Sequence, residues 1–458
     1  MGLLDALHAG TRGLAAASAG IDVTTQNVTN VNTPGYSRRT VAQQTSDPVV
    51  KAGLFLGNGP DVTGVTRITD RLLGTRLVAA TGDKAAADSL EASLKVIEPY
   101  FDEASGTGIV ASLDAFFDSI SAASSDPSST SLRLGVVNAA RTFATTVSRT
   151  AGGVQAAIDG FDTQLGEGLD SVNADLAEIA SLNGKIGRSG ATSGPADLLD
   201  RRDELIKGLG ATIGATVDLA ASGQATVFVG GHAVVSGGEA RTLSVTTDVA
   251  GVTQVSVSMD GGSMQVTSEL GGEWGGLVEA RASAQGYLDS LDEFAATFTE
   301  AVNAQHAAGF DANGAAGADM FSVGASGAAG FSLDSALASD SNLLAFAGDT
   351  TAAAGDSTNL QSLLSIESDD SMFSTGTAHT FLSAIASTVG GDIAAATASV
   401  ETQGQLTSDL ETARASVSGV DTDEEAMHLL QYQAAYRAAA RVVSAADELI
   451  GDLLMIGR

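Results

Sequence analysis

Two heptad patterns, one at each end of the chain, restrict its fold more than any other feature. Near the N-terminus, apolar residues recur every seven positions, at Leu7, Leu14, Ile21 and Val28. Near the C-terminus, the same period fills both positions of a seam, with Leu429, Tyr436, Val443 and Ile450 in one row and Tyr432 and Leu453 in the other. The spacing predicts amphipathic helices over about residues 3–29 and from 423 almost to the end, and each needs a partner for its apolar stripe.

The N-terminal helix is expected to be weak on its own. It carries glycine at positions 2, 10, 13 and 20, and each glycine costs about 1 kcal/mol of helix stability relative to alanine. Two arrangements remain open, an intramolecular two-helix stem and a surface through which copies assemble. We expect both ends to be mobile in the monomer, so that slow amide exchange over residues 3–29 at low concentration would contradict this expectation.

A distinctive segment, NVTNVNTPGYSRRT at residues 27–40, follows the first predicted helix. Its Thr-Pro-Gly-Tyr core suits a type II turn, and the residue before a proline avoids the helical region, so the helix should end here. We expect the asparagine amides to cap backbone groups or to reach a neighbouring subunit, and the tyrosine to anchor the turn on the adjacent domain. The residues concerned are Asn27, Asn30, Asn32, Pro34, Gly35 and Tyr36.

The middle of the chain changes its period twice. Helical spacing prevails to about residue 210 and again from 271, whereas residues 211–270 alternate apolar and polar side chains as strands do. The pattern predicts a mainly α fold with an inserted β-domain, an α+β multidomain chain with paired terminal helices, a central helical bundle and a small β-sandwich or barrel-like domain. We divide it into a terminal helical assembly domain (1–52 with 418–458), a central helical domain (53–210 with 271–417), the β-domain (211–270) and a Gly/Ala-rich loop region (304–356).

Several local patterns predict specific contacts. Asn58-Gly59 and Asp260-Gly261 are typical of tight hairpin turns. Thr422 followed three residues later by Glu425 is the pattern of a capping box at the start of the C-terminal helix. In DLLDRRDELIKGL at 197–209, the spacing favours ion pairs along one helix, Asp197 with Arg201 and Asp203 with Lys207.

Charge and composition exclude several functions. The chain of 458 residues has 55 Asp and Glu against 23 Lys and Arg, a formal charge of -32, which repels nucleic acid and anionic membranes. It has no cysteine, and therefore no disulfide or thiolate metal site. We find no basic, apolar leader that would indicate a cleaved signal peptide, and no stretch of about 20 apolar residues to insert in a membrane.

No constellation of residues indicates catalysis. The five histidines are scattered without metal-binding spacing. The sequence DANGAAGAD at 311–319 begins like a calcium loop but lacks the later ligands, so a turn is favoured. Phosphate-binding glycine motifs and nucleophile elbows are missing. We therefore expect neither an enzyme nor a bound cofactor or metal.

The residues 27–36 resemble the signature of the flagellar axial proteins, the family of rod, hook and junction proteins, in which a helix precedes Asn-x-x-Asn-x-Asn-Thr-Pro-Gly-Tyr. The next residues and four further segments, at 57–73, 197–209, 301–314 and 418–443, are similar to the hook-filament junction members. Arg39 stands where those members usually have glutamine. After 301–314 only a short Gly/Ala-rich stretch follows, so we expect the outermost domain to be reduced or absent.

This resemblance implies a structural protein without catalysis. It implies export unfolded through the flagellar type III channel without a cleaved signal peptide, a chaperone at the C-terminal helix, and an extracellular ring of copies between hook and filament. The implied partners are the chain itself, the hook protein and the second junction protein on the filament side. Alternatives are another axial protein, of hook or distal rod, or an extracellular binding module carried by residues 211–270.

Overall fold

The computed structural model describes residues 2–51, 54–189, 195–220, 222–248, 252–352 and 355–456. Contacts between residues group the chain into two compact units, each made from segments far apart in the sequence. The first unit comprises Met1–Ala85, Leu169–Gly272 and Thr402–Arg458, and the second comprises Ala86–Gly168 and Glu273–Glu401. The helices α2 (Arg71–Ile97) and α10 (Ala378–Ser418) contribute residues to both units.

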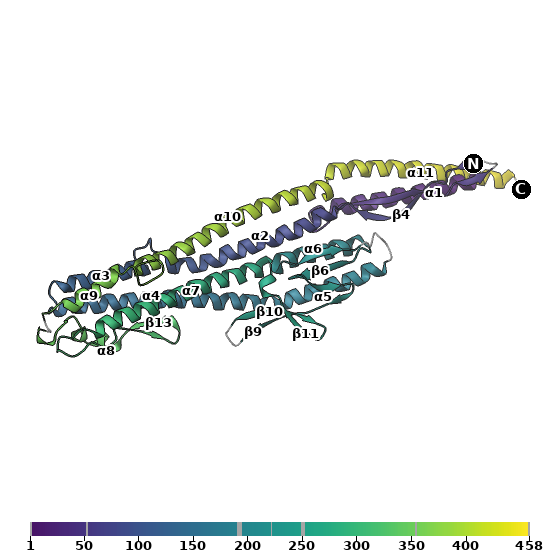
Figure 1. The fold of residues 1–458 in the computed structure, drawn as a ribbon. Coiled ribbons are helices and arrows are strands. Elements are labelled where there is room, and N and C mark those ends of the chain that lie inside the picture. Colours follow the sequence, from purple (N-terminus) through teal and green to yellow (C-terminus); the bar gives the residue numbers. More distant parts are fainter. Residues whose placement is uncertain are drawn as a thin grey trace. The chain divides into compact units, whose positions relative to one another are not determined.

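The terminal helices of the first unit lie side by side (Figure 1). They are α1 (Leu3–Thr29) and α11 (Thr422–Ile456), with the bounds that the heptad patterns predicted to within a residue or two. The predicted capping box is wrong. Asp421 caps α11 instead, because its Oδ1 accepts the backbone N–H groups of Asp423 and Glu424 at 2.9 and 3.2 Å. The Glu425 side chain is thus left available for contacts with other elements.

Four short strands follow α1. The strand β1 (Arg39–Thr45) pairs antiparallel with β4 (Pro60–Arg67), and β2 (Val49–Lys51) pairs with β3 (Leu54–Leu56). The predicted hairpin at Asn58-Gly59 is wrong, because the residues before it pair with β2 and those after it pair with β1. Gly59 has a positive φ of 88°, so the pattern did mark a sharp change of chain direction.

The β-rich part of the first unit follows the helices α5 (Leu169–Arg188) and α6 (Ala196–Ile213). One sheet has the order β5-β6-β7-β8 and another the order β11-β10-β9. The Asp260-Gly261 turn is confirmed, since Met259 pairs directly with Gly262 and Gly261 has a φ of 100°. The strands are β5 (Thr216–Leu219), β6 (Ala225–Val229), β7 (His232–Ser236), β8 (Glu239–Ala240), β9 (Leu243–Thr247), β10 (Thr253–Met259) and β11 (Gly262–Gln265). A short 3₁₀ helix, η2 (Thr267–Glu269), follows them.

The second unit is a helical bundle with an aromatic core. It contains part of α2, then η1 (Glu98–Phe101), α3 (Ile109–Ser124), α4 (Thr130–Glu167), α7 (Gly272–Ala307), α9 (Thr358–Ser365), η5 (Ile366–Ser368) and part of α10. Rings from these helices and from a hairpin contact one another at centroid distances of 5.0–6.3 Å. The fully buried rings are Phe116, Phe117, Phe143, Phe294, Phe298, Phe321, Phe331 and Phe346.

The Gly/Ala-rich region of 304–356 forms short elements around this core. They are β12 (Phe321–Gly324), β13 (Gly327–Leu333), α8 (Ser335–Ser339), η3 (Ser341–Leu343) and η4 (Thr350–Ala352). Asp311 is buried, and its Oδ1 accepts the N–H groups of Asn313 and Ala315 at 2.8 Å each, which makes the calcium-like sequence a turn. No group of three or more His, Asp or Glu in the described part of the chain is arranged to hold a metal ion.

The two compact units follow boundaries other than the four predicted divisions. The sequence pattern separates helices from strands, whereas contacts hold α5, α6 and both sheets in one unit with the terminal pair. The long helices α2 and α10 each have residues in both units, so a change from helical to strand periodicity in the sequence does not mark a boundary between the units. The functional division into a terminal assembly domain and a central domain stays a prediction.

His306 lies in the core of the second unit, with an exposed fraction of 0%. Its Nδ1 contacts the Ala318 carbonyl oxygen at 2.5 Å, and its Nε2 accepts the N–H of Ala345 at 2.9 Å. These partners select the neutral ring with its proton on Nδ1. Burial lowers the pKa of His306, which the Ala318 carbonyl and the charge of Asp319 partly oppose.

Lowering the pH should therefore destabilise the second unit. Because the pKa of His306 is lower in the folded chain, the unfolded chain binds the proton first, near its ordinary pKa of about 6.5. The stability that the neutral ring provides is complete above that pH and is lost as the pH falls through the folded pKa. Urea midpoints measured between about pH 7.5 and about pH 5.5 should fall less steeply for His306→Asn than for the natural chain. Parallel curves for the two proteins would exclude this histidine as the cause.

Candidate functional site on the terminal helix pair

The two terminal helices approach each other along a row of small residues on α1. A Cβ atom built on Gly20 would lie 2.5 Å from the Tyr432 ring, and one built on Gly10 would lie 2.8 Å from Val443. Such distances leave no room for a side chain, so glycine permits the close approach of α11. Two of the glycines that weaken α1 alone, Gly10 and Gly20, are therefore sites of tight contact with α11.

The predicted N-terminal stripe does not lie at the centre of this seam. Leu7, Leu14 and Ile21 are only half-buried, and Val28 is 39% exposed. The buried positions of α1 belong to rows of smaller residues: Gly10, Ala16, Ala17, Gly20, Val23, Thr24 and Asn27. The residues of the predicted stripe thus lie at the edge of the helix pair, where part of their surface is exposed to solvent.

The predicted residues of α11 divide in a similar way. Tyr432 and Val443 face α1 at the glycines, and both are half-buried. Leu429 and Ile450 are half-buried as well, whereas Tyr436 is 43% and Leu453 59% exposed. The structure brings part of the predicted set together and leaves the remainder available to other molecules.

Asn27 joins three segments of the chain at the end of α1. It is buried, and its Nδ2 donates to the Arg39 carbonyl at 2.9 Å and to Glu425 Oε2 at 3.0 Å. Its Oδ1 accepts the Arg39 N–H at 3.0 Å and the Tyr36 hydroxyl at 2.8 Å. All four hydrogen-bonding positions of the amide are therefore used. This first asparagine holds together α1, the turn and α11 of one chain.

The other two asparagines have different surroundings. The Asn30 amide donates to the Gln26 carbonyl at 3.0 Å and accepts the Thr33 hydroxyl at 3.1 Å, so it caps the end of α1. Asn32 is exposed. Capping is thus observed for Asn30, and a contact of Asn32 with a neighbouring subunit stays a prediction.

The predicted type II turn is confirmed. The Tyr36 N–H donates to the Thr33 carbonyl at 3.2 Å, and Gly35 has a φ of 79°. A Cβ atom on Gly35 would also lie 2.9 Å from Glu204 Oε2. Burial raises the pKa of the Tyr36 phenol, and the nearby Arg39 cation opposes this rise. The phenol consequently stays a neutral donor to Asn27.

Two arginines after the turn connect it to separate helices. Arg38 donates from Nε to Glu425 at 2.8 Å and from Nη1 to Glu424 at 3.0 Å, both on α11. Arg39 is buried and pairs through Nη2 with Asp197 at 2.6 Å and Asp200 at 2.8 Å, both on α6. This ionic network ties the first turn of α11 to α6 through the signature segment.

The ion pairs predicted along α6 are wrong. Asp203 pairs with Arg67 at 3.0 Å and with Arg202 at 2.6 Å, and Arg201 pairs with Glu178 at 2.8 Å. Lys207 pairs with Glu411 on α10 at 3.3 Å. Apart from the pair of Arg202 with Asp203, these charges of α6 therefore bind other elements, which spacing within one helix cannot reveal.

One helical stretch of the described residues, Ala378–Met455, has an 18-residue window of mean hydropathy 1.3, of which 28% is buried. This stretch contains α10 and α11, and length and composition alone make it apolar enough to cross a membrane. The sequence-based expectation overlooked this window. A single such stretch is weak evidence for a membrane span.

Three family models match parts of this chain. The model described as "Flagellar hook-associated protein FlgK helical domain" matches residues 94–321. "Flagella basal body rod protein" matches 7–36, which covers most of α1 and the turn. "Flagellar basal body rod FlgEFG protein C-terminal" matches 413–455, which covers nearly all of α11.

Full-length relatives carry one name. The "Flagellar hook-associated protein 1" of Escherichia coli (strain K12) is 25% identical, over 97% of this chain and 98% of its own length. The protein of the same name from Bacillus subtilis (strain 168) is 26% identical, over 98% of this chain and 97% of its own. The solved structure of the flagellar hook junction protein FlgK from Burkholderia pseudomallei has a similar fold, with a TM-score of 0.67 at 16% identity over 75% of this chain and 100% of that one. The chain therefore belongs to the flagellar hook-associated protein 1 family, the structural proteins of the junction between flagellar hook and filament.

Proposed function

We propose that copies of this chain form the junction ring by packing the exposed apolar face of the α1 and α11 pair against neighbouring copies. The observation that carries the proposal is the distribution of exposed apolar side chains. Among the described residues, α11 alone presents eight large ones: Met427, Leu430, Tyr436, Val442, Leu449, Leu453, Leu454 and Met455. On α1, Leu4 is 64% exposed. Exposed apolar side chains in such number along one helix mark an interaction surface.

The burial of apolar surface favours assembled copies over a single chain whose terminal helix pair is exposed. Burying one leucine against a neighbour contributes about 1.5–3 kcal/mol. Several such residues on each copy, repeated around a ring, would exceed the cost of ordering the helices. The polar network at Asn27 and Arg38 sets the base of the pair, so the apolar face of every copy is presented in the same orientation. Mobility of both ends in the monomer stays a prediction.

We also propose the finer partners and the route. The ring contacts the hook protein on one side and the second junction protein on the other, outside the cell. The chain reaches that place unfolded through the type III channel, without a cleaved signal peptide, and a chaperone covers the apolar face of α11 before export. Nucleic acid and membrane lipid are not partners in this proposal, because the chain carries a charge of -32. No catalytic step is involved.

Replacing an exposed leucine of α11 should impair assembly but not folding. Leu430 is 67% exposed, so Leu430→Ser should leave the urea midpoint of the purified chain within experimental error. In a strain lacking the natural copy, which should bear hooks without filaments and release flagellin, the variant should restore roughly tenfold fewer filaments than the natural chain. Export of the variant is checked by its amount in the medium.

Leu134→Ser is the matched control, because Leu134 is 51% exposed on α4 of the second unit. It removes the same side chain from another surface and should restore filaments fully. Equal filament counts for the two variants would refute assembly through the exposed face of α11.

A further inference from the structure

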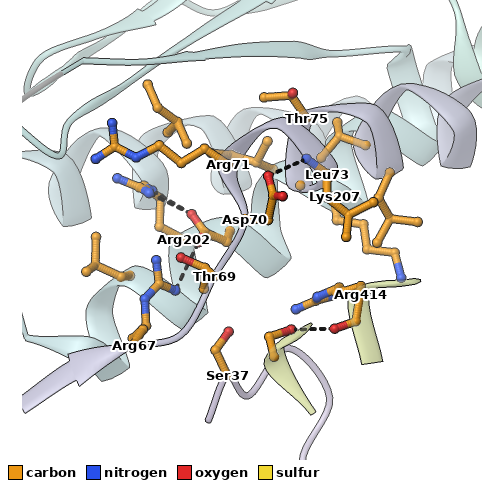
Figure 2. Close-up of a pocket in the computed structure, with 18 of the residues that line it drawn as sticks. Ser37, Arg67, Thr69, Asp70, Arg71, Leu73, Thr75, Arg202, Lys207 and Arg414 are labelled. Atoms are coloured by element: carbon orange, nitrogen blue, oxygen red, sulfur yellow. Dashed lines mark hydrogen bonds and ion pairs between the residues drawn. The ribbon is translucent and has the colours of Figure 1, made fainter. Parts of the chain in front are cut away.

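A cavity of about 320 Å³ lies in the first unit, where α10 ends (Figure 2). Its walls come from β4, the start of α2, α6, β5 and the last turns of α10. The floor is apolar, with Leu77, Val78 and Ile206 all buried. The lining contains more cations than anions, although the whole chain has more than twice as many anions as cations. The cavity thus has the opposite charge balance to the rest of the protein.

The cations differ in whether they are already engaged. Arg67 and Arg202 both pair with Asp203. In contrast, Arg71 and Arg414 have no carboxylate of the described residues within ion-pair distance. Arg414 makes one long contact, from Nη2 to the Gly35 carbonyl at 3.5 Å. Figure 2 shows the Arg414 side chain directed from α10 into the cavity. Two guanidinium groups are therefore available to an incoming anion.

The walls define the chemistry of an occupant. Guanidinium groups select a carboxylate, with which they make strong paired hydrogen bonds. The apolar floor selects alkyl groups beside that carboxylate, and a simple inorganic anion would leave it uncovered. A cavity of about 320 Å³ is within the size range of small-ligand pockets and can hold a few side chains of a peptide. An acidic residue flanked by apolar residues meets all three conditions.

The C-terminal end of α11 has this composition. Leu454 and Met455 are 69% and 75% exposed, the most exposed large apolar side chains in the described part of the chain, and the exposed Asp452 lies two residues before Leu454. The cavity includes Ser418, just before α11, and α11 has 35 residues, so the tip lies about 50 Å away along a helix rising ~1.5 Å per residue. The tip therefore cannot reach the cavity of its own chain.

We propose that the cavity binds the tip of α11, residues 452–455, from a second copy of this chain. Asp452 of that copy pairs with Arg414, and its leucines cover the apolar floor. Tip and cavity are different surfaces, so the contact joins copies head to tail and repeats from one copy to the next, as a ring or a helical array requires. The inference rests on the proposed assembly, to which it adds a defined contact.

A labelled peptide with the sequence of residues 446–456 tests the contact. Its fluorescence anisotropy is followed as purified full-length chain is added, at chain concentrations where sedimentation shows a monomer. The natural chain should bind it saturably, and Arg414→Gln should weaken binding roughly tenfold. Arg71→Gln is a second variant should the first fold poorly. Arg76→Gln, an exposed arginine of α2 outside the cavity, is the matched control and should bind as the natural chain does.

Changes in the peptide complete the test. Asp452→Asn should weaken binding to the natural chain but add little to the loss in Arg414→Gln, because both remove the same ion pair. Leu454→Ser should weaken binding to every chain. Octanoate supplies a free carboxylate with an alkyl tail. If octanoate binds and the peptide does not, a small carboxylate rather than a second copy is the occupant, and the proposal is overturned.

Failure here is distinguishable from failure of the proposed function. The peptide assay requires no ring, so absent or Arg414-independent binding would overturn the assignment of the cavity alone. The Leu430→Ser filament count would be unaffected by that result. Conversely, the natural chain could bind the peptide as described while the Leu430→Ser variant restores filaments fully. That pair of results would support the cavity contact and refute assembly through the exposed face.

Discussion

Replacing Asn27 by alanine should destabilise the first unit by about 3–5 kcal/mol, a large loss for an exchange of one small side chain. The reason is that four groups lose their hydrogen bond to the Asn27 amide. The buried carboxylate of Glu425, the Tyr36 hydroxyl and both backbone groups of Arg39 would each lose a hydrogen bond. A buried polar group without a partner costs about 1–3 kcal/mol, and such costs add only in part.

The measurement must distinguish the two compact units, because they need not unfold together. Amide exchange over β1, which starts at Arg39, reports on the first unit. It should become faster in Asn27→Ala, whereas exchange in the aromatic core of the second unit should not change.

Asn32→Ala is the matched control for this prediction. Asn32 is exposed, so its replacement should change stability by less than about 0.5 kcal/mol. A loss of filaments with normal stability would then support contact of Asn32 with a neighbouring subunit. Equal losses of stability in the two variants would show that Asn27 does not act through its buried hydrogen bonds.

Replacing Gly20 by alanine should separate the terminal helices and reduce stability by about 1–3 kcal/mol. A new Cβ atom would lie 2.5–2.7 Å from three atoms of the Tyr432 ring, one of which is Cγ, so the ring cannot simply turn away. Alanine is a better helix former than glycine by about 1 kcal/mol, so this clash must exceed a gain. Unfolding of the first unit by urea and filament counts should both show the loss.

Gly13→Ala is the control with the opposite expected sign. Its Cβ would contact the Ala439 methyl group at 3.4 Å, an ordinary packing distance. The gain in helix propensity should then stabilise α1 by up to about 1 kcal/mol. In the Gly20→Ala chain, a second change of Tyr432→Ala should recover part of the stability by making space. Similar effects of the Gly13 and Gly20 changes would mean that glycine content, and not contact with Tyr432, governs the pair.

Local sequence predicts the elements of this chain well. The heptad spacing predicts α1 and α11, and the bounds agree within two residues. The Thr-Pro-Gly-Tyr turn and the Asp260-Gly261 hairpin were predicted because proline fixes φ locally and glycine readily adopts a positive φ.

Partners are predicted poorly, since they depend on segments far apart in the sequence. Arg39 pairs with Asp200, 161 residues away, and Asn27 with Glu425, 398 residues away. The charges of α6 looked like pairs within one helix, and the glycines of α1 looked only like weaknesses. In the structure, aspartates of α6 pair with arginines of β1 and β4, and Gly10 and Gly20 of α1 allow the close approach of α11.

The sequence by itself determined where the terminal helices and the turn lie, and its signature residues determined the family. These properties depend on local backbone preferences and on periodicity, which neighbouring residues define. Only the tertiary structure decided that small residues, not Leu7 and Leu14, form the close contact between the helices. It alone placed Asn27 in a buried network and Arg414 in a cavity. The physical reason is that periodicity shows which residues share a face, whereas packing chooses which face meets a partner.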